Sequence, residues 1–399
     1  MSNRGRGGSV QRVVVPQPPL TRLTPPPARS AFVFGPRGTG KSTAARQWFP
    51  GARTVDLRDT ELGSALRASP RRLHTLLDDE PVDRWIVIDE IQRVPALLDV
   101  VHQRLDNEPS RRFLMTGSSP RQLYRAGANL LGGRADVMTM PSFLAAELGS
   151  AFTLDRAMRI GMLPVVCTAD DPEVALRSYV RVAVYEELRF EANIRRLDDF
   201  ARALEQFALC QGALWSPTTI AAAAQARKST VTEWFRMLEE MYLIARLDVF
   251  TRRPSRRSLA LTPKVYFADC GVARALRPTV AAVDAPDAVG ATREGLVYQH
   301  LAAWCAAHPR AGLWTWRTSR GVEVDFVIET PDDLIGIDVK STRDLRPADR
   351  RGLLAFHDEF PDARLIALTD SALPAQHGPI REQPLEDWLR RLVPGAPLP

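Results

Sequence analysis

The stretch that decides the fold is Gly35-Pro36-Arg37-Gly38-Thr39-Gly40-Lys41-Ser42, which follows the apolar run Ala31–Phe34. It matches the pattern GxxxxGK[ST] in full, and a strand before it and a helix after it (43–48) are the context that this pattern requires. The glycines let backbone N–H groups turn inward around phosphates, while the helix directs its positive dipole end at the same anion. The sequence therefore predicts a phosphate-binding loop. A glycine turn that binds nothing is the weaker alternative.

Lys41 would reach the β and γ phosphates of ATP, and Ser42 would ligate Mg²⁺. A second apolar run, Trp85–Ile88, predicts a buried parallel strand that ends in Asp89 and Glu90. Asp89 would hold Mg²⁺ through water, and Glu90 would orient and deprotonate the attacking water, which favours hydrolysis over binding alone. An Asp-Glu pair that only caps a helix is the alternative.

A third strand, Arg112–Met115, leads into Thr116 and Ser118, which are candidates for sensing the γ phosphate. Further on, Arg134 follows two glycines and suits an arginine finger, acting in cis or across a subunit boundary. An ordinary surface arginine fits the spacing equally well. The expected nucleotide-site residues are Gly35, Pro36, Arg37, Gly38, Thr39, Gly40, Lys41, Ser42, Thr43, Asp89, Thr116 and Ser118, with Glu90 and Arg134 as catalytic residues.

Taken together, GPRGTGKS, VIDEIQRVP, FLMTGSS and LGGRADVMTMPSF resemble prokaryotic AAA-type ATPases that carry a C-terminal domain of unknown function. The resemblance spans roughly residues 30 to 393. It implies an α/β fold with a five-stranded parallel sheet and helices on both faces. One departure is the front end, where a proline-rich segment replaces the short helix usual in the family.

The amino-acid composition limits the classes of protein to which the chain can belong. The chain has 399 residues, of which 45% are apolar and 25% charged, enough for two or three globular domains. No apolar stretch is long enough for a membrane span or a secretory signal, so we expect a cytoplasmic protein without membrane contact. The cysteines show no metal-binding or paired spacing and are expected to be reduced core thiols; they are Cys167, Cys210, Cys270 and Cys305.

Residues 1–30 hold five of the 53 basic residues, none of the 47 acidic ones, and six prolines, so they are expected to be disordered. The arm could touch nucleic acid nonspecifically, although a solvated extension explains it better. Beyond it, the patterns predict an AAA-like ATPase domain at 31–150, a helical lid or connector at 151–200, a winged-helix domain at 201–263 and a further α/β domain at 264–393.

A helix-turn-helix is predicted by two short helices. Ser216-Pro217 starts a helix that runs through Ala224, and a capping box over 230–233 opens the next one. An apolar stripe from Val231 to Tyr242 would be buried, which leaves polar residues outward for DNA. Docking onto a protein is the alternative, because nothing marks base-specific contacts. The candidate DNA-binding residues are Lys228, Thr232 and Arg236 on the helix and Arg252, Arg253, Arg256 and Arg257 on a β wing.

The last third predicts a helix, three strands, a helix and a strand, an αβββαβ order that spans 292–369. Asp338 and Lys340 are two apart on one strand and so share a face, where they could meet Asp325 of the preceding strand. Two carboxylates there could bind Mg²⁺, or Mn²⁺ in its place, and Lys340 could position the attacking water. Glu294, on the first helix, could complete the cluster.

Glu294, Gly321–Asp325 and Ile337–Lys340 resemble the PD-(D/E)xK restriction-endonuclease-like superfamily. The resemblance implies metal-dependent DNA cleavage by Asp325, Asp338 and Lys340, although the usual proline before the first Asp is missing. A fold kept only for binding is the alternative. The sequence thus predicts an oligomeric ATPase that binds DNA and cuts it. The alternatives are a nucleotide-switched DNA- or protein-binding regulator with a silent nuclease-like domain, and a signalling ATPase that docks proteins.

Overall fold

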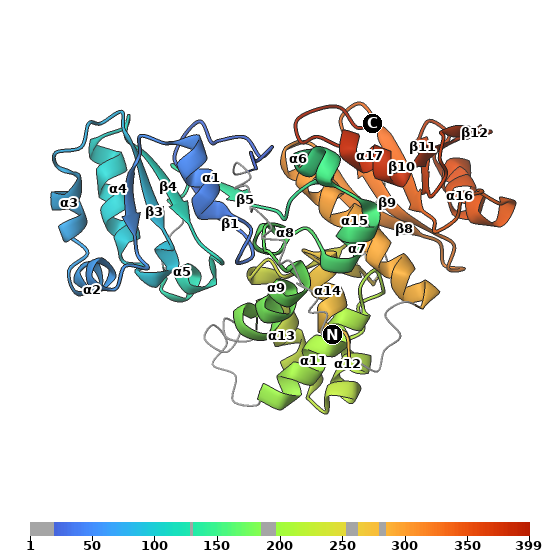
Figure 1. The fold of residues 1–399 in the computed structure, drawn as a ribbon, viewed down its shortest axis with the longest axis horizontal. Coiled ribbons are helices and arrows are strands. Elements are labelled where there is room, and N and C mark those ends of the chain that lie inside the picture. Colours follow the sequence, from blue (N-terminus) through green and yellow to red (C-terminus); the bar gives the residue numbers. More distant parts are fainter. Residues whose placement is uncertain (1–19, 128–130, 185–196, 253–261, 279–284) are drawn as a thin grey trace, which may run out of the picture.

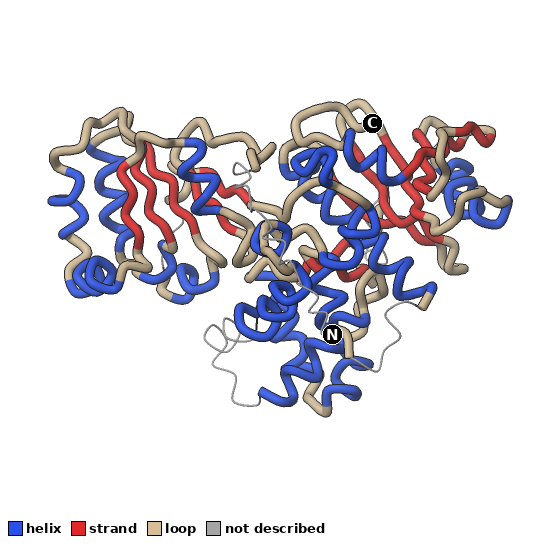
Figure 2. The backbone as a smooth tube through the Cα atoms, in the orientation of Figure 1, coloured by secondary structure: helices blue, strands red, loops and turns tan. Residues whose placement is uncertain are grey.

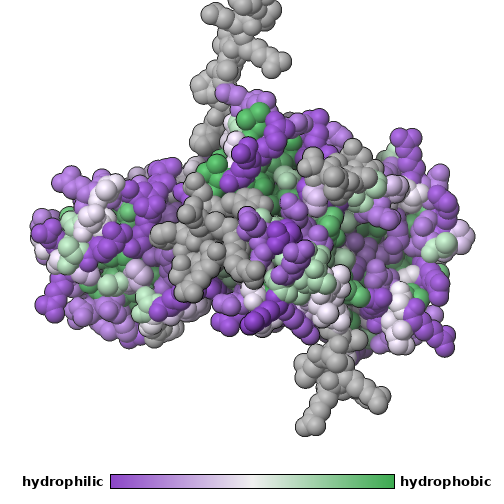
Figure 3. All heavy atoms as spheres, turned by 90° about the horizontal axis from the view of Figure 1, so that it is seen from below, coloured by the Kyte–Doolittle hydropathy of each residue, from purple (hydrophilic) through white to green (hydrophobic). Residues whose placement is uncertain are grey.

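The structure is a computed structural model that describes residues 20–127, 131–184, 197–252, 262–278 and 285–399. Three units follow one another along the chain (Figure 1). Figure 2 shows the two large sheets at opposite sides of the molecule, with the mostly helical second unit below and between them. The face drawn in Figure 3 is covered mainly by hydrophilic side chains. Among the described residues, no helix is both long and apolar enough to cross a membrane.

The first unit is built on a parallel sheet whose order is β2-β3-β4-β1-β5. Every neighbouring pair in it is parallel. Because β1, β3 and β4 are adjacent, the loops that follow them meet at one edge of the sheet. The five-stranded parallel sheet implied by the resemblance is confirmed. Its strands are β1 (Ala31–Phe34), β2 (Arg53–Asp56), β3 (Trp85–Asp89), β4 (Arg112–Thr116) and β5 (Asp136–Thr139).

Helices cover both faces of this sheet, as expected. The small residues Ala44 and Ala45 let α1 (Lys41–Trp48) pack closely against one face, beside Val33 and Leu114. The opposite face buries Phe32, Ile86 and other strand residues under the remaining helices. These are α2 (Thr60–Ala68), α3 (Arg72–Leu77), the short η1 (Ile91–Arg93), α4 (Leu97–Asn107) and α5 (Arg121–Arg125).

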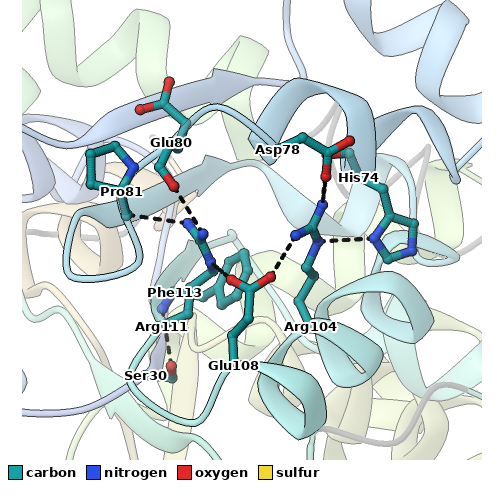
Figure 4. A network of polar contacts seen from close by, with 9 residues as sticks. All are labelled: Ser30, His74, Asp78, Glu80, Pro81, Arg104, Glu108, Arg111 and Phe113. Atoms are coloured by element: carbon teal, nitrogen blue, oxygen red, sulfur yellow. Dashed lines mark hydrogen bonds and ion pairs between the residues drawn. The ribbon is translucent and has the colours of Figure 1, made fainter.

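A polar network fixes the far edge of this domain (Figure 4). Arg104 of α4 donates hydrogen bonds to His74 and Glu108, and Arg111 donates to Glu108 and to the carbonyl oxygen of Glu80. Burial alone would raise the pKa of Glu108, but the two guanidinium groups hold it below its usual value. The network ties α3, α4 and the start of β4 together, away from the phosphate-binding loop, so its role is structural.

The second unit has one apolar core that runs from Ile160 to Leu276. Its helices are α6 (Ala145–Leu148), η2 (Gly149–Ala151), α7 (Leu154–Ile160), α8 (Pro164–Cys167), α9 (Pro172–Ser178), η3 (Tyr179–Val184), α11 (Leu197–Leu209), α12 (Pro217–Ala224), α13 (Lys228–Glu240) and α14 (Cys270–Leu276). Strands β6 (Ile244–Leu247) and β7 (Lys264–Phe267) pair antiparallel. The boundary expected between 263 and 264 therefore falls within this two-stranded sheet, because β7 and α14 complete the core of the second unit.

The two helices predicted for a helix-turn-helix are α12 and α13. Ser216 caps α12, and Pro217 is its first residue, as the sequence predicts. The capping box expected at 230–233 is wrong, since α13 begins at Lys228 with no side-chain cap. The Thr232 hydroxyl donates to the carbonyl oxygen of Lys228, four residues back, so these residues already lie inside the helix.

The third unit has a six-stranded mixed sheet of order β12-β13-β11-β10-β9-β8. Helices α15 and α17 cover one face, and α16 covers the other. The predicted αβββαβ order is present, followed by a hairpin and a helix that the sequence did not suggest. The elements are α15 (Pro286–Ala306), β8 (Gly312–Arg317), β9 (Glu323–Glu329), β10 (Leu334–Val339), η5 (Pro347–Arg350), α16 (Arg351–Glu359), β11 (Arg364–Thr369), β12 (Ala375–His377), β13 (Ile380–Pro384) and α17 (Leu385–Arg391).

The amino-terminal arm differs from its prediction. Residues 1–19 lie outside the described part of the chain, but 20–30 pack onto the first two units, so the expectation of disorder through residue 30 is wrong there. Arg22 is 7% exposed and forms an ion pair of 3.0 Å with Glu147. It also donates to the carbonyl oxygens of Thr39 and Pro141. Composition alone could not show that this arginine has buried partners.

The four cysteines are free thiols in the structure. Burial raises the pKa of each thiol, that of Cys167 and Cys305 to about 12. Each thiol therefore stays protonated near neutral pH, and Cys270 is the fully buried one.

Candidate functional sites

The phosphate-binding loop has the backbone that its sequence predicts. Gly38 and Gly40 adopt φ values of 79° and 81°, in the left-handed region that favours glycine. The Lys41 side chain is buried and donates to the carbonyl oxygens of Gly35 at 2.7 Å and Pro36 at 2.9 Å. Its ammonium group thus lies across the loop, where it can meet phosphate oxygens.

Asp89 lies at the centre of the site and contacts residues of α1 and β4. Its Oδ1 accepts a hydrogen bond of 2.9 Å from the Ser42 hydroxyl and another from the Thr116 hydroxyl. A carboxylate beside a hydroxyl is the hard-oxygen donor set that Mg²⁺ prefers, so the residues fit this ion. Thr116 thus lies against Asp89, and its role in sensing the γ phosphate stays a prediction.

Arg58, which sequence reasoning missed, approaches Asp89 from the end of β2. Its guanidinium lies 2.9 Å from Asp89 Oδ2 and also pairs with Asp56. The hydrogen bond to Asp56, followed by the charge of Asp89, raises the pKa of Arg58 above its ordinary value. β2 was not predicted from the sequence. A basic residue shortly after this strand was therefore the only sign that Arg58 belongs to the site.

Glu90 is held in a strained conformation by its neighbours. Its φ of 63° is unusual for a residue with a side chain, and its N–H donates to the Thr116 hydroxyl at 3.2 Å. The Gln92 amide donates both to Glu90 Oε2 and, at 3.2 Å, to the Ser118 hydroxyl. A Cβ on Gly117 would lie 2.6 Å from Gln92 Oε1, so a side chain there would displace the Gln92 amide. The predicted catalytic carboxylate is therefore linked to Ser118 through Gln92, and the Glu90 backbone is bonded directly to Thr116.

The second unit closes one side of this site. A cavity of about 680 Å³ is lined by loop residues, by Arg58 and Glu90, and by apolar residues of α8, α9 and η3, among them Val165, Ala175 and Val182. The Tyr179 hydroxyl donates to the carbonyl oxygen of Arg37 at 2.8 Å, and the Val165 N–H donates to that of Gly38 at 3.2 Å. An apolar wall next to a polar cradle suits a nucleobase joined to phosphates.

Arg134 lies far from the phosphate loop of its own chain. It precedes β5, at the amino ends of the strands, whereas the phosphate loop follows the carboxyl end of β1. Its guanidinium pairs with Asp106 of α4 at 2.8 Å. The prediction of a finger acting in cis is therefore wrong. A finger acting on a neighbouring subunit stays a prediction.

The structure describes four of the seven predicted DNA-contacting residues. Lys228, Thr232 and Arg236 are exposed on α13, but Thr232 and Arg236 face the first domain across a groove of about 700 Å³. Arg252 lies 5.1 Å from the ring of Phe360 in the third unit, where it can make a cation–π contact. Arg253, Arg256 and Arg257 lie outside the described residues.

The predicted acidic centre of the third unit is brought together by the fold. Strands β9 and β10 run antiparallel with Ile337 opposite Phe326, which places Asp338 next to Asp325. The Val339 N–H donates to Asp325 Oδ2 at 2.9 Å, and the Lys340 ammonium lies 2.8 Å from Asp338 Oδ2. Glu294 reaches the same cluster from α15, through Lys264.

Lys264 and Tyr266, both on β7 of the second unit, complete this centre and were not expected. The Lys264 ammonium donates to Glu294 Oε1 at 2.9 Å and to Asp325 Oδ1 at 3.2 Å. The Tyr266 hydroxyl also donates to Glu294 Oε1. Lys264 and Asp325 are 61 positions apart, so no local pattern could have joined them.

Burial and charge together set the protonation of the centre. Burial alone would lower the pKa of Lys264, but Asp325 and Glu294 hold it above its ordinary value. Burial would likewise raise the pKa of Asp325, but Lys264 and Lys340 hold it low. Burial and the charge of Asp325 raise the pKa of Asp338 well above its usual range, and they raise that of Glu294 to about 7. The ionised pair is thus Lys264 with Asp325, while Asp338 favours its neutral form.

A divalent metal does not fit this arrangement. Lys264 already occupies the Glu294 and Asp325 oxygens that face each other, and Lys340 occupies one oxygen of Asp338. Within the described part of the chain, no group of three or more His, Cys, Asp or Glu residues is placed to hold a metal ion. One buried atom in the centre, Asp338 Oδ1, has no hydrogen-bond partner among the described residues.

Comparisons with known proteins support the assignment of the first unit and give no function for the other two. Residues 28–149 match a family described as an AAA domain, while 151–282 and 289–380 match two domains of unknown function (DUF8612 and DUF4143). The first unit thus has the sequence and the sheet of an AAA domain. Uncharacterized proteins of Mycobacterium bovis and Mycobacterium tuberculosis are each 27% identical over 324 residues, covering 78% of this chain and 70% of theirs.

Similarity to solved structures is low overall. The replication initiator DnaA bound to AMPPCP and single-stranded DNA has a TM-score of 0.27 at 16% identity, over 53% of this chain and 82% of that one. A signal transduction ATPase with numerous domains, with a tetratricopeptide repeat sensor, from Pyrococcus horikoshii has a TM-score of 0.25 at 12% identity, over 71% of this chain and 48% of that one.

Proposed function

We propose that this chain hydrolyses ATP and that its nucleotide state sets how tightly the winged-helix unit binds DNA. The observation that carries the proposal is the contact chain at the sheet edge, in which Asp89 accepts from Ser42 and Thr116 while Glu90 lies next in sequence. Ser42 and Asp89 would hold Mg²⁺, which would neutralise phosphate charge when bound.

In the proposed reaction, Glu90 accepts a proton from water as the water oxygen bonds to the γ phosphorus. The bond from that phosphorus to the β,γ-bridging oxygen breaks, and ADP leaves with the electron pair. Lys41 stabilises the charge on the phosphate oxygens, and Gln92 keeps Glu90 directed at the site.

Two contacts support coupling to the winged-helix unit. Tyr179 joins η3 to the phosphate loop, so that nucleotide binding acts directly on the second unit. On the other side, the Ser119 hydroxyl accepts a hydrogen bond from the Arg121 N–H at the start of α5, and the Arg121 guanidinium pairs with Glu240 at the end of α13. A shift of the sensor loop would therefore move the helix that carries the candidate DNA contacts.

The test is ATP hydrolysis together with DNA affinity, measured by anisotropy of a labelled duplex with ADP and with a nonhydrolysable ATP analogue. We expect Lys41→Ala to abolish hydrolysis, and DNA affinity to differ between the two nucleotides in the unchanged chain. A DNA affinity that changes with neither the nucleotide nor the salt concentration would indicate protein docking instead, because phosphate contacts make DNA binding salt-dependent. Light scattering with ATP would test the predicted oligomer and the role of Arg134 between subunits.

DNA cleavage by the third unit is a second candidate, favoured by the convergence of Glu294, Asp325, Asp338 and Lys340. Lys264 argues against an active state, since it fills the cation position of this cluster. We infer that the centre is silent as arranged. Plasmid DNA incubated with Mg²⁺ or Mn²⁺ should stay intact; cleavage that Lys340→Ala abolishes would overturn this inference.

A further inference from the structure

A cavity of about 480 Å³ lies where the three units meet. Its walls come from β5 of the first unit, the start of β6 in the second, α15 of the third, and the arm at Thr24 and Pro25. β5 is an edge strand of the first sheet and lies toward the other two units (Figure 1). The volume of this cavity is typical of sites that bind small molecules.

Short side chains on one face of α15 create the hollow. Gln299, Ala302, Ala303 and Ala306 all line it, and their spacing of three and four residues places them on the same face of the helix. Three of these four side chains are single methyl groups, so they leave space that larger side chains would fill. Val137 of β5 also lines the cavity and is 54% exposed, although it is apolar. The fold therefore leaves an apolar surface uncovered here.

The walls of this cavity carry no charge. None of the residues that line it, all of them within the described part of the chain, is acidic or basic, whereas 25% of the whole chain is charged. By contrast, Lys41 and Glu90 line the cavity at the phosphate loop, and Arg121 and Glu240 line the groove beside α13. An ionic ligand would lose its hydration here without gaining a counter-charge. The walls therefore favour an uncharged ligand.

One buried polar side chain in the wall lacks a partner. Gln299 is 5% exposed, and its Oε1 accepts a hydrogen bond of 3.2 Å from the Cys270 N–H. The Nε2 of the same amide has no hydrogen-bond partner among the described residues. A buried donor without an acceptor is unfavourable, and a ligand carbonyl oxygen at this wall would supply the acceptor.

Two tyrosines give the cavity rigid aromatic walls. Tyr242 and Tyr298 both line it. The ring of Tyr242 stacks on Phe34 with 6.3 Å between the ring centroids, and the ring of Tyr298 stacks on Tyr266 at 4.3 Å. Because both rings are already held by neighbours, a flat aromatic ligand could pack against them with little loss of side-chain entropy.

Two contacts join these walls to the phosphate loop. Pro36 lines the cavity, and its carbonyl oxygen accepts a hydrogen bond of 2.9 Å from the Lys41 ammonium. Arg22 donates both to the carbonyl oxygen of Pro141 in the wall and to that of Thr39 in the loop. A ligand that shifts either wall would change the contacts of the loop, so ligand and ATP would each alter the affinity for the other.

We propose that this cavity binds an uncharged, mainly aromatic small molecule that carries a carbonyl oxygen, and that its occupancy is coupled to the nucleotide site. The binding of such a ligand is independent of the proposed function. The coupling rests on the ATP binding that the proposed function requires.

Benzophenone is a suitable probe, because it has two uncharged rings and one carbonyl group, and ultraviolet light attaches it covalently to a nearby C–H bond. The full-length chain is labelled over a range of benzophenone concentrations, digested and mapped by mass spectrometry. We expect saturable labelling at one site, on β5 around Met138 or on α15 around Ala303. Labelling that does not saturate, or that maps to other segments, overturns the proposal.

Two competitors test the chemistry of the ligand on the unchanged chain. Benzoylbenzoate has the shape of benzophenone and one negative charge, so it should compete at least about tenfold less well than unlabelled benzophenone added in the dark. Diphenylmethane lacks the carbonyl oxygen and should also compete less well. Equal competition by benzoylbenzoate contradicts the uncharged ligand, and equal competition by diphenylmethane contradicts the role of Gln299.

A variant and a nucleotide complete the test. Ala302→Phe should fill the cavity and reduce labelling about tenfold, whereas Ala288→Phe, on α15 outside the cavity, is the matched control. A nonhydrolysable ATP analogue should change the affinity for benzophenone by about fivefold or more, and an unchanged affinity would overturn the coupling. ATP hydrolysis is assayed on the same samples. Its absence counts against the proposed function, whereas saturable labelling reports on the cavity alone.

Discussion

The Tyr179 hydroxyl donates a hydrogen bond of 2.8 Å to the carbonyl oxygen of Arg37, so the second unit contacts the phosphate loop of the first. The aromatic ring also packs against the loop, because a side chain on Gly38 would lie 3.3 Å from it. The cavity beside the phosphate loop is thus formed by the two units together. An isolated first unit would lack its apolar wall.

Tyr179→Phe tests this contact with the smallest change available. Losing one hydrogen bond to a loop carbonyl should weaken ATP binding by about 3- to 10-fold, the equivalent of roughly 0.5–1.5 kcal/mol. The effect should appear in the KM for ATP and leave kcat nearly unchanged. Tyr124→Phe, on an exposed side chain of α5, is the matched control. An unaltered KM would show that η3 does not contribute to the nucleotide site.

Glu90→Gln separates binding from hydrolysis. Glutamine keeps the shape but cannot accept the proton of the attacking water, so kcat should fall by about 10²- to 10⁴-fold, as for loss of a general base. ATP affinity, measured with a fluorescent analogue, should change less than about twofold. Glu61→Gln, at an exposed position of α2, should have no effect. If the Glu90 variant hydrolyses ATP at the normal rate, the base lies elsewhere.

The first domain could be predicted because its chemistry is local. Strand, loop and helix are contiguous around Lys41, and Asp89 directly ends an apolar run. Arg58 and Tyr179 could not be found this way, since each reaches the site from an element that carries no motif. Their positions follow from the packing of β2 beside β3 and of η3 against the loop.

The acidic centre shows the same limit. The period of two along β10 and the antiparallel order correctly bring Asp338 and Lys340 to Asp325, because strand geometry is regular. Lys264 was missed since it belongs to a different unit, and it decides whether a metal fits. The prediction that Arg134 acts as an arginine finger in cis was wrong for a related reason. A glycine pair indicates a flexible segment, but the direction of β5 decides at which edge of the sheet that segment lies.

Glu240→Gln tests coupling between the sensor loop and α13. Glu240 pairs with Arg121 of α5 through one oxygen and with Arg236 of its own helix, at 2.9 Å, through the other. Removing the charge should reduce the difference in DNA affinity between the ADP and ATP-analogue states, while hydrolysis continues. Glu233→Gln, on an exposed position lining the same groove, is the control. Coupling that survives in Glu240→Gln would assign the connection to the Tyr179 side alone.

His300 should make stability depend on pH in the acidic range. It is buried on α15, where Nε2 accepts from the Ala145 N–H at 2.9 Å and Nδ1 lies 2.8 Å from the carbonyl oxygen of Leu296. Because Nε2 accepts, Nδ1 carries the proton and the ring is neutral. The ring also lies edge-on to Phe152, at 6.4 Å. Burial lowers the pKa of His300 to about 4, from 6.5.

Since the folded pKa lies below the unfolded one, the unfolded chain binds the extra proton first. The contribution of His300 to stability is therefore complete above pH 6.5 and is lost as the pH falls toward 4, by about 3 kcal/mol in all. His300→Gln retains an acceptor for Ala145 but cannot titrate. Its midpoint of urea unfolding should therefore fall less than that of the unchanged chain between pH 7 and pH 4.5. Parallel pH profiles for the two proteins would show that His300 does not hold α6 against α15 in its neutral form.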